Sequence, residues 1–518
     1  MKQVKRILRM VFLLAVVIGC LSFHAFAEEM ELMTTQMDLC EAADALSLQG
    51  ETDTREAEEY IYAALSAGET EIDVLRFGFT LDKQTGQSLE LIACMERVRY
   101  HHPDLFYVLS WPYYVNSRGS VTRIVPVYMA DAQRKEAQAL YQGELETILK
   151  GMEKDWSDLE KILYINDYLA SRYRYDLRVK INSQAANYDA YTFFRDGTGV
   201  CQAYYNACKA LLDACGIPST FGISERANHI WNVVRLNGKW YHLDVTWNDP
   251  TNDILGLASH EYFLLSTDKL LELDPNRTDW VCGEKVSCTD TTYNDYYWRE
   301  VSAPFVMTKG DWYYSAEDAI CVTDDVSRTG KAVINHELWR FQGGYWPGTY
   351  SGLGTYKGWL IYNTGNAVMG YEPVSKQLHT FATFSEPKRL IFGMAVLGNK
   401  AVCERDIHPW CNADAYSNGA CGENREEEVS LAWLDELNAK SYGGVTASED
   451  GGLVTVQGKP DPKKPFCVIA AGYTTDGKLC DRKMIWSTEL SSGKTQWQMK
   501  GAAVKIFMLT QQTWLPVG

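Results

Sequence analysis

Three side chains of the types that acyl-transfer chemistry on a thiol requires follow one another along this chain. Cys201 lies in the stretch GTGVCQAYYNACKALLDACG, and His229 and Asp244 lie further on in HIWNVVRLNGKWYHLDVTW. If the three converge, Cys201 attacks a carbonyl carbon and His229 takes the thiol proton and later protonates the leaving group. Asp244 then fixes the tautomer and orientation of the imidazole. The sequence elements around each residue have to position it for that role.

The residues after Gly199 predict an amphipathic helix that begins at Cys201. Apolar side chains recur there at helical spacing, and Gly216 and Pro218 mark the end of the helix. Cys201 is therefore expected in the first turn, where unpaired backbone N–H groups and the helix dipole favour the thiolate, which is the reactive form. The same N–H groups could contribute to an oxyanion hole. Cys208 lies deeper in the helix and is expected to be a small apolar packing residue.

The dipeptide Asn237-Gly238 between two β-rich runs predicts a hairpin with a two-residue type I′ turn. In that register Asp244 opposes Trp231, and His229 is one diagonal step away. Side chains two residues apart share a face of the strand, so His229 and Asp244 are expected on the same side. A register slip of one residue would separate them.

The same face of the hairpin carries two further kinds of candidate. His242 is a rival base, but it lies nearer the turn and directly beside Asp244 in sequence, so we favour His229 as the base and a structural role for His242. The tryptophans of this region are favoured as hairpin core and cleft wall, with contact to substrate as the alternative. They are Trp231, Trp240 and Trp247.

The run GVCQAYYNACKALLDACGIPSTFGI, then HIWNVVRLNGKWYHLDVTWNDP and HEYFLLS, resembles the bacterial transglutaminase-like superfamily from Trp156 to about Asp268. The resemblance implies a papain-like core with a Cys-His-Asp triad, whose members fall on Cys201, His229 and Asp244. The superfamily includes protein cross-linkers, peptidases, peptide N-glycanases and members without a catalytic role. It therefore indicates the fold and the triad more strongly than the outcome of the reaction.

The amino terminus predicts export. Four basic residues precede an apolar run from Met10 to about Phe23, and Ala25-Phe26-Ala27 follows with the pattern of a signal-peptide cleavage site. A competing interpretation is a lipoprotein box at Val17–Cys20 with Cys20 lipidated, and we favour soluble release. Removal of residues 1–27 takes away four positive charges, so the formal net charge moves from −17 to −21. Such an acidic chain is not expected to bind nucleic acid, and membrane contact is expected only through a lipid anchor at Cys20.

Thirteen of the fourteen cysteines remain after cleavage, and an odd number agrees with one reactive free thiol. Spacing leaves open pairing among Cys403, Cys411 and Cys421, of Cys282 with Cys288, and of Cys467 with Cys480, so no connectivity is predicted. No C-x-x-C pair suggests zinc. We expect neither a metal nor a cofactor.

The fold class predicted is α+β, with a papain-like/transglutaminase-like catalytic core, an α+β N-terminal region and β-rich C-terminal domains. The predicted segments are a signal peptide (1–27), an N-terminal α+β domain (28–151), the catalytic domain (152–272), a β-rich accessory domain (273–450) and a module (451–518) that resembles an immunoglobulin-like β-sandwich. Leu105–Val108 and Val121–Tyr128 are predicted strands, and a capping box of Ser157 with Glu160 opens a helix to about Tyr173. Gly451-Gly452 and Pro460–Pro465 are predicted as a linker.

Two aromatic strands after Gly310 and Gly358, with a weaker echo near Gly398, recur at a period typical of propeller blades, but too few copies exist to close a ring. The expected function is that of an exported cysteine-dependent acyl-transfer enzyme acting on peptide or protein amide bonds, favoured as a peptidase or amidase. Its substrate is expected to be a peptide or protein, with cell-wall and host proteins as candidates. The alternatives are a protein-cross-linking transglutaminase and a non-catalytic cell-surface binding protein that retains the fold.

Overall fold

The computed structural model describes residues 31–33 and 54–510, apart from 181, 183–185, 250–253, 337–338, 342–343, 347–351, 387–388, 407–424, 438–439, 443–444, 476 and 491–492. The chain forms two compact units, residues 1–138 and 139–518, each treated by itself below. The predicted leader with Cys20, together with Cys411 and Cys421, lies outside the described residues. Among the described helices, none has the length and apolar character needed to cross a bilayer. Helices and strands are both abundant, which confirms the mixed α+β fold class.

The first unit combines helices with a small antiparallel sheet of order β1-β4-β5-β2 and a two-stranded β3-β6 pair. Its elements are β1 (Glu31–Met33), α3 (Arg55–Ala67), β2 (Ile72–Asp73), η1 (Leu75–Phe77), α4 (Leu89–His101), η2 (Pro103–Leu105), β3 (Val108–Ser110), β4 (Tyr113–Val115), β5 (Val121–Ile124) and β6 (Val127–Tyr128). Helix α5 (Asp131–Leu149) continues into the second unit.

Two strand predictions in this unit need correction. Leu105–Val108 is not a strand, because Pro103 starts a 3-10 turn that ends at Leu105, and only Val108 begins a strand. Val121–Tyr128 is two strands rather than one. Pro126 has no N–H to give to a strand ladder, and the chain leaves the ladder between Ile124 and Val127.

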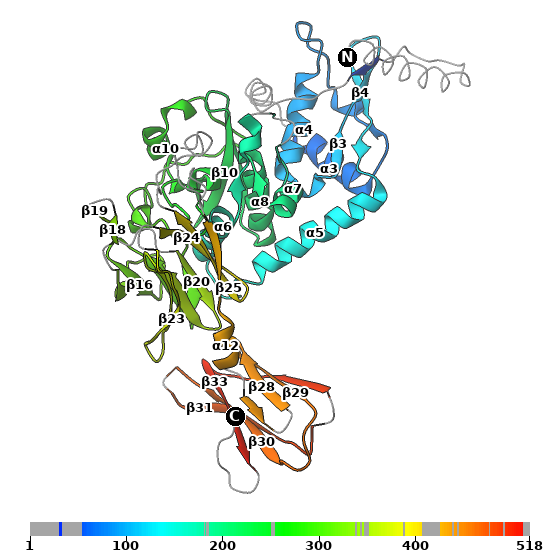
Figure 1. The fold of residues 1–518 in the computed structure, drawn as a ribbon. Coiled ribbons are helices and arrows are strands. Elements are labelled where there is room, and N and C mark those ends of the chain that lie inside the picture. Colours follow the sequence, from blue (N-terminus) through cyan, green and yellow to red (C-terminus); the bar gives the residue numbers. More distant parts are fainter. Residues whose placement is uncertain are drawn as a thin grey trace. The chain divides into compact units, whose positions relative to one another are not determined.

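The second unit begins with helices packed on a five-stranded sheet of order β12-β11-β10-β9-β13. Figure 1 shows α8 beside β10, and these two elements are in contact. The elements are α6 (Asp158–Arg172), β7 (Arg174–Tyr175), η3 (Leu177–Lys180), α7 (Ala190–Asp196), β8 (Thr198–Gly199), α8 (Cys201–Ala214), β9 (Ser219–Ser224), β10 (His229–Leu236), β11 (Lys239–Leu243), α9 (Val245–Asn248), β12 (Phe263–Leu265), α10 (Thr267–Leu273), η5 (Pro275–Arg277), β13 (Val281–Cys282) and η6 (Tyr297–Glu300). The predicted capping box at Ser157 and Glu160 is present and opens α6.

The sheet of this core continues past residue 272, where the predicted catalytic domain ends. Strand β13 pairs with β9 through Val281 and Cys282, and η5 lies between it and α10. Residues after 272 that contact this sheet, such as those of β13, therefore belong to the same folded core as the residues before 272.

Next come three antiparallel meanders, with orders β14-β15-β16-β17, β20-β21-β22-β23 and β24-β25-β26, and a separate β18-β19 pair. The strands are β14 (Val306–Thr308), β15 (Asp311–Ser315), β16 (Ala319–Thr323), β17 (Lys331–Asn335), β18 (Trp339–Phe341), β19 (Gly344–Trp346), β20 (Leu353–Tyr356), β21 (Trp359–Asn363), β22 (Ala367–Glu372), β23 (Gln377–Thr383), β24 (Leu390–Leu397), β25 (Lys400–Asp406) and β26 (Arg425–Ser430). The two aromatic motifs seen in the sequence are β15 and β21, each the second strand of its meander. A turn with positive φ at Gly310 or Gly358 precedes each.

Two further sheets of orders β27-β28-β29-β32 and β31-β30-β33 enclose an apolar core that includes Val454, Val468 and Met508. The elements are α12 (Ala432–Leu437), β27 (Lys440–Tyr442), β28 (Val445–Asp450), β29 (Leu453–Gly458), β30 (Phe466–Tyr473), β31 (Leu479–Trp486), β32 (Gly493–Gln498) and β33 (Ala503–Thr510). The linker prediction at Gly451-Gly452 is wrong, because both glycines have positive φ and form the tight turn that joins β28 to β29. The immunoglobulin-like assignment and the five-segment division stay predictions.

Candidate active site

Cys201 is the first residue of α8, as the sequence predicts, and its side chain is buried with 5% exposure. The chain segment that leads into α8 is tightly packed. Strand β8 pairs in parallel with β7, which places Gly199 opposite Tyr175, and the chain then turns into the helix. A Cβ on Gly199 would lie 2.5 Å from the Ala203 side chain and 2.6 Å from the Phe193 ring. Glycine is therefore required there for the close approach that positions Cys201.

The hairpin carries His229 and Asp244 in the register that the turn predicts. Leu236 pairs with Lys239 and the ladder continues to Asn232 opposite Leu243. Asn237 and Gly238 have φ of 52° and 80°, as a type I′ turn requires. His229 is the first residue of β10, and Asp244 follows the last residue of β11 and caps α9 by accepting a hydrogen bond from the Trp247 backbone N–H.

His229 and Asp244 are in contact. The imidazole Nε2 lies 2.7 Å from Asp244 Oδ2, and both side chains are buried. The Cys201 side chain interacts with the same imidazole both electrostatically and through a hydrogen bond. Because Asp244 occupies Nε2, Nδ1 is the ring nitrogen left for the thiol. The structure thus brings together the three residues that the sequence singles out, and their catalytic role stays a prediction.

Burial and neighbouring charges have opposite effects on the pKa values of His229 and Asp244. Burial alone would lower the pKa of His229, but the Asp244 carboxylate and Cys201 outweigh it and raise the pKa from 6.5 to about 9. Burial would also raise the pKa of Asp244, but His229 and the Arg277 guanidinium outweigh it and hold that pKa at about 2. Near neutral pH the site therefore contains a protonated imidazole hydrogen-bonded to a carboxylate.

His242 has the structural surroundings that the sequence analysis favours. Its Nδ1 accepts a hydrogen bond from the Trp231 indole at 3.0 Å, and its Nε2 lies 3.1 Å from Thr267 Oγ1. Burial and the Arg277 charge lower the pKa of His242 to about 3, so it is neutral and both ring nitrogens have partners.

The three tryptophans differ in their surroundings. Trp231 is buried against His229 and His242, and Trp240 packs against the same apolar cluster. Trp247 is 47% exposed, and its ring meets the His229 ring edge to face at a centroid distance of 6.2 Å. Of these three tryptophans, Trp247 is therefore the one whose ring is open to solvent beside His229.

Sequence reasoning missed three residues at this site. Arg277 contributes Nη1 at 2.6 Å from Asp244 Oδ2, and the half-buried Tyr175 and Tyr188 interact electrostatically with Cys201. Burial first, and then Cys201, raises the pKa of both phenols, so they remain protonated donors. No sequence signal marked Arg277, which follows the predicted end of the domain. The Tyr175 position follows only from the β7-β8 pairing.

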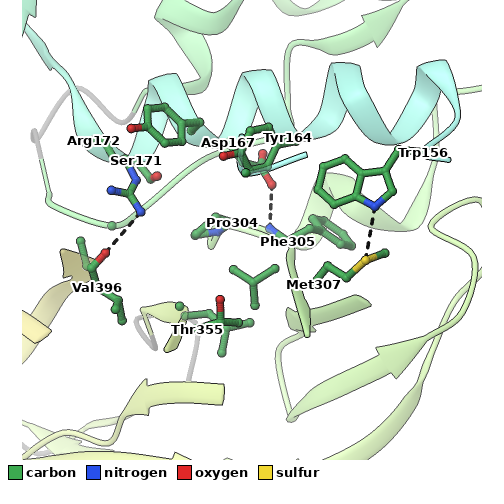
Figure 2. A pocket seen from close by; sticks show the side chains of 17 residues that line it. Trp156, Tyr164, Asp167, Ser171, Arg172, Pro304, Phe305, Met307, Thr355 and Val396 are labelled. Carbon is green, nitrogen blue, oxygen red and sulfur yellow. Dashed lines mark hydrogen bonds between the residues drawn. The ribbon is translucent and has the colours of Figure 1, made fainter. Parts of the chain in front are cut away.

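A cavity of about 210 Å³ lies elsewhere in the second unit, between α6, residues 304–307 and strands β20 and β24. Figure 2 shows Trp156, Asp167 and Phe305 on its wall, with the Asp167 carboxylate accepting from the Phe305 backbone N–H at 2.6 Å. None of Cys201, His229 and Asp244 lines it. The predicted site at Cys201, His229 and Asp244 is therefore separate from this cavity.

The predictions on cysteine pairing and on metal binding can be compared with the structure only for the residues that it describes. Cys282, Cys288, Cys403, Cys467 and Cys480 are free thiols, so the pairs 282–288 and 467–480 are not formed. Within the described ranges, no group of three His, Cys, Asp or Glu side chains is arranged to hold a metal ion.

Comparison with known proteins gives the class of this domain. The family profile of the Transglutaminase-like superfamily matches residues 146–245, so the chain contains a transglutaminase-like domain. The matched range includes Cys201, His229 and Asp244. The superfamily match supports a cysteine-dependent enzyme at that level. No curated protein matches the chain.

Two solved structures are similar over parts of the chain. One is a candidate cysteine protease from Cytophaga hutchinsonii, at 17% identity and a TM-score of 0.17, covering 24% of this chain and 51% of that one. The other is the extracellular domain of a candidate one-component system from B. thetaiotaomicron, at 9% identity and a TM-score of 0.20, covering 56% of this chain and 41% of that one. This chain thus spans about half the length of the first structure.

Proposed function

We propose that this protein is an exported cysteine acyl-transfer enzyme that hydrolyses peptide or protein amide bonds through a thioester on Cys201. The observation that carries the proposal is the contact of His229 with Asp244 at 2.7 Å, with Cys201 on the same imidazole at the start of α8. A chance cluster of buried residues would not be expected to combine a helix N-terminus, a thiol, an imidazole and an ionised carboxylate within one matched domain.

The proposed reaction has two halves. The Cys201 thiolate attacks the amide carbonyl carbon, the oxyanion forms near the N-terminus of α8, and the C–N bond breaks as His229 gives its proton to the leaving amine. Water then attacks the thioester, His229 accepts the water proton, and the C–S bond breaks to release a carboxylic acid. The thiolate and the protonated imidazole are restored. Asp244 stays ionised and keeps Nδ1 of His229 directed at the sulfur.

Hydrolysis is favoured over cross-linking because water needs no dedicated acceptor site. The half-exposed Trp247 beside His229 supports solvent access at the edge of the site. A lysine acceptor would convert the same thioester into an isopeptide cross-link. The acceptor, and not the triad, therefore distinguishes the two enzymes.

A trapping experiment tests the proposal. The secreted protein is incubated with a casein-like substrate, and the mass of the peptide that contains Cys201 is followed after rapid acid quenching. We expect an acyl adduct in the Cys201-intact protein and none in Cys201→Ala, with Cys208→Ala as the control that keeps the adduct. Absence of any adduct, together with equal alkylation of all accessible cysteines, would favour the non-catalytic binding protein.

A second measurement identifies the acceptor. A fluorescent primary amine is added with the same substrate, and new amino termini and free ammonia are measured in parallel. New termini or ammonia without incorporated dye support the proposed hydrolase. Dye incorporated into the substrate would instead assign the cross-linking activity.

A further inference from the structure

Arg277 is the most completely buried charged side chain near the predicted triad. It ends η5, is 0% exposed, and its Nη1 lies 2.6 Å from Asp244 Oδ2. Its Nε lies 3.0 Å from Asp274 Oδ2. The guanidinium therefore joins the Asp244 carboxylate to a second carboxylate on the preceding turn.

The surroundings restrict the guanidinium to this geometry. Its carbon lies 4.7 Å from the centroid of the Trp231 ring, and 5.2 Å from those of Trp247 and Tyr262. Arginine is suited to such a place, because its planar fork makes directional hydrogen bonds and stacks on aromatic rings. A lysine could keep the charge but could not hold two carboxylates in the same fixed arrangement.

The contact pattern on Asp244 indicates what Arg277 does. Oδ2 receives both His229 Nε2 and Arg277 Nη1, while Oδ1 accepts from the Trp247 backbone N–H. A buried carboxylate with only one cationic partner would be costly to ionise. Arg277 adds a second cation at Oδ2, and the Trp247 N–H at Oδ1 helps to hold the carboxylate in the orientation in which it accepts from Nε2.

A second carboxylate, that of Asp274, lies against the same guanidinium. Arg277 by itself would disfavour a charged imidazole so close by, and Asp274 offsets that repulsion. Other titratable groups that interact with Asp244 or Arg277 stay neutral at pH 7: Tyr175, Tyr262, Cys208 and His242.

We propose that Arg277, held by Asp274, is the positioning residue that keeps the Asp244 carboxylate ionised and fixed against His229, making a four-residue relay Cys201–His229–Asp244–Arg277. The inference rests on the proposed function of Cys201, but its test does not depend on which substrate or acceptor the enzyme uses. Arg277 touches neither the thiol nor a substrate and acts only through Asp244.

The test is the pH dependence of Cys201 alkylation by iodoacetamide, from pH 4 to pH 10, in the full secreted chain. In Arg277→Met we expect the acid limb of labelling to move to higher pH than in the wild type, because without the guanidinium Asp244 becomes protonated at a higher pH. Arg277→Lys should restore labelling at pH 5 while remaining slower than the wild type at pH 7. Arg405→Met removes a buried guanidinium on β25 that pairs with Glu427, and it should leave the profile unchanged.

The possible results are distinguishable. An unchanged acid limb in a folded Arg277→Met protein would overturn the proposal, whereas a Cys201 that reacts no faster than other thiols in the wild type would overturn the proposed function instead. If Arg277→Met does not fold, Asp274→Asn gives the answer. Loss of that offsetting charge should move the alkaline limb to lower pH than in the wild type, and an alkaline limb that stays in place would reject the role of the Arg277–Asp274 pair.

Discussion

Replacement of Asp244 by asparagine tests the coupling between the carboxylate and the imidazole most directly. The wild-type pKa of His229 is about 9, so at pH 7 about 99% of the imidazole is protonated. Asp244 is the largest influence that raises this pKa. Without its charge, only Cys201 opposes the effect of burial, and the pKa falls; if it returned to the ordinary value of 6.5, about one quarter of the imidazole would be protonated at pH 7.

The expected result is a loss of thiol reactivity in the neutral range. If the thiolate depends on its imidazolium partner, alkylation of Cys201 at pH 7 should slow about fourfold in Asp244→Asn. The assay is the second-order rate of iodoacetamide labelling, measured by the mass of the peptide that contains Cys201. Asp249→Asn is the matched control, because Asp249 is a buried carboxylate five residues on that binds the Tyr204 hydroxyl.

A stability measurement separates chemistry from folding in this variant. Removal of one charge from a buried ion pair leaves Arg277 without compensation at Nη1 and costs about 3–5 kcal/mol. The near-ultraviolet circular dichroism spectrum should nevertheless match that of the wild type below the unfolding transition. If a folded Asp244→Asn protein is labelled at pH 7 within twofold of the wild-type rate, the carboxylate does not control the imidazole and the reasoning is refuted.

Three further predictions concern the same site. The pKa of His229 is raised from 6.5 to about 9, so its contribution to stability is complete below pH 6.5, and about 3 kcal/mol of it is lost as the pH rises through 9. Urea unfolding of the wild type at a series of pH values should show this loss. If the free energy of unfolding of His229→Gln changes with pH in the same way as that of the wild type, the prediction is contradicted. Trp247→Ala should lower kcat/KM about three- to tenfold through KM while leaving Cys201 alkylation within twofold, and an unchanged KM would place substrate elsewhere. Gly222→Ala puts a Cβ 2.6 Å from the Trp231 indole and should cost about 1–3 kcal/mol, whereas Gly143→Ala on α5, with nothing within 4 Å, should not destabilise the chain.

The local part of the site could be predicted from the sequence. Asn237-Gly238 specifies a type I′ turn, and the period of two along a strand then determines which side chains share a face, so the register of β10 and β11 followed from a dipeptide. The glycines before Cys201 and Gly216 after it likewise determined the ends of α8. These features depend on backbone conformations within a few residues of one another, which sequence encodes directly.

Where local signals were ambiguous, the prediction was wrong. Gly451-Gly452 was interpreted as a linker, yet two glycines serve equally well as the turn between β28 and β29, and only the pairing of those strands decides between the two. Leu105–Val108 has the composition of a strand, but Pro103 begins a 3-10 turn that includes Leu105, the first residue of that segment. Composition alone does not contain the hydrogen-bond partners that choose between such alternatives.

The sequence by itself determined that a thiol, an imidazole and a carboxylate belong to one helix and one hairpin. Only the tertiary structure brought Arg277, with its partner Asp274, into contact with Asp244, and placed Tyr175 near Cys201 through the β7-β8 pairing. The physical reason is that a buried charge acquires its partner from whichever segment packs against it, and that segment can lie at any distance along the chain.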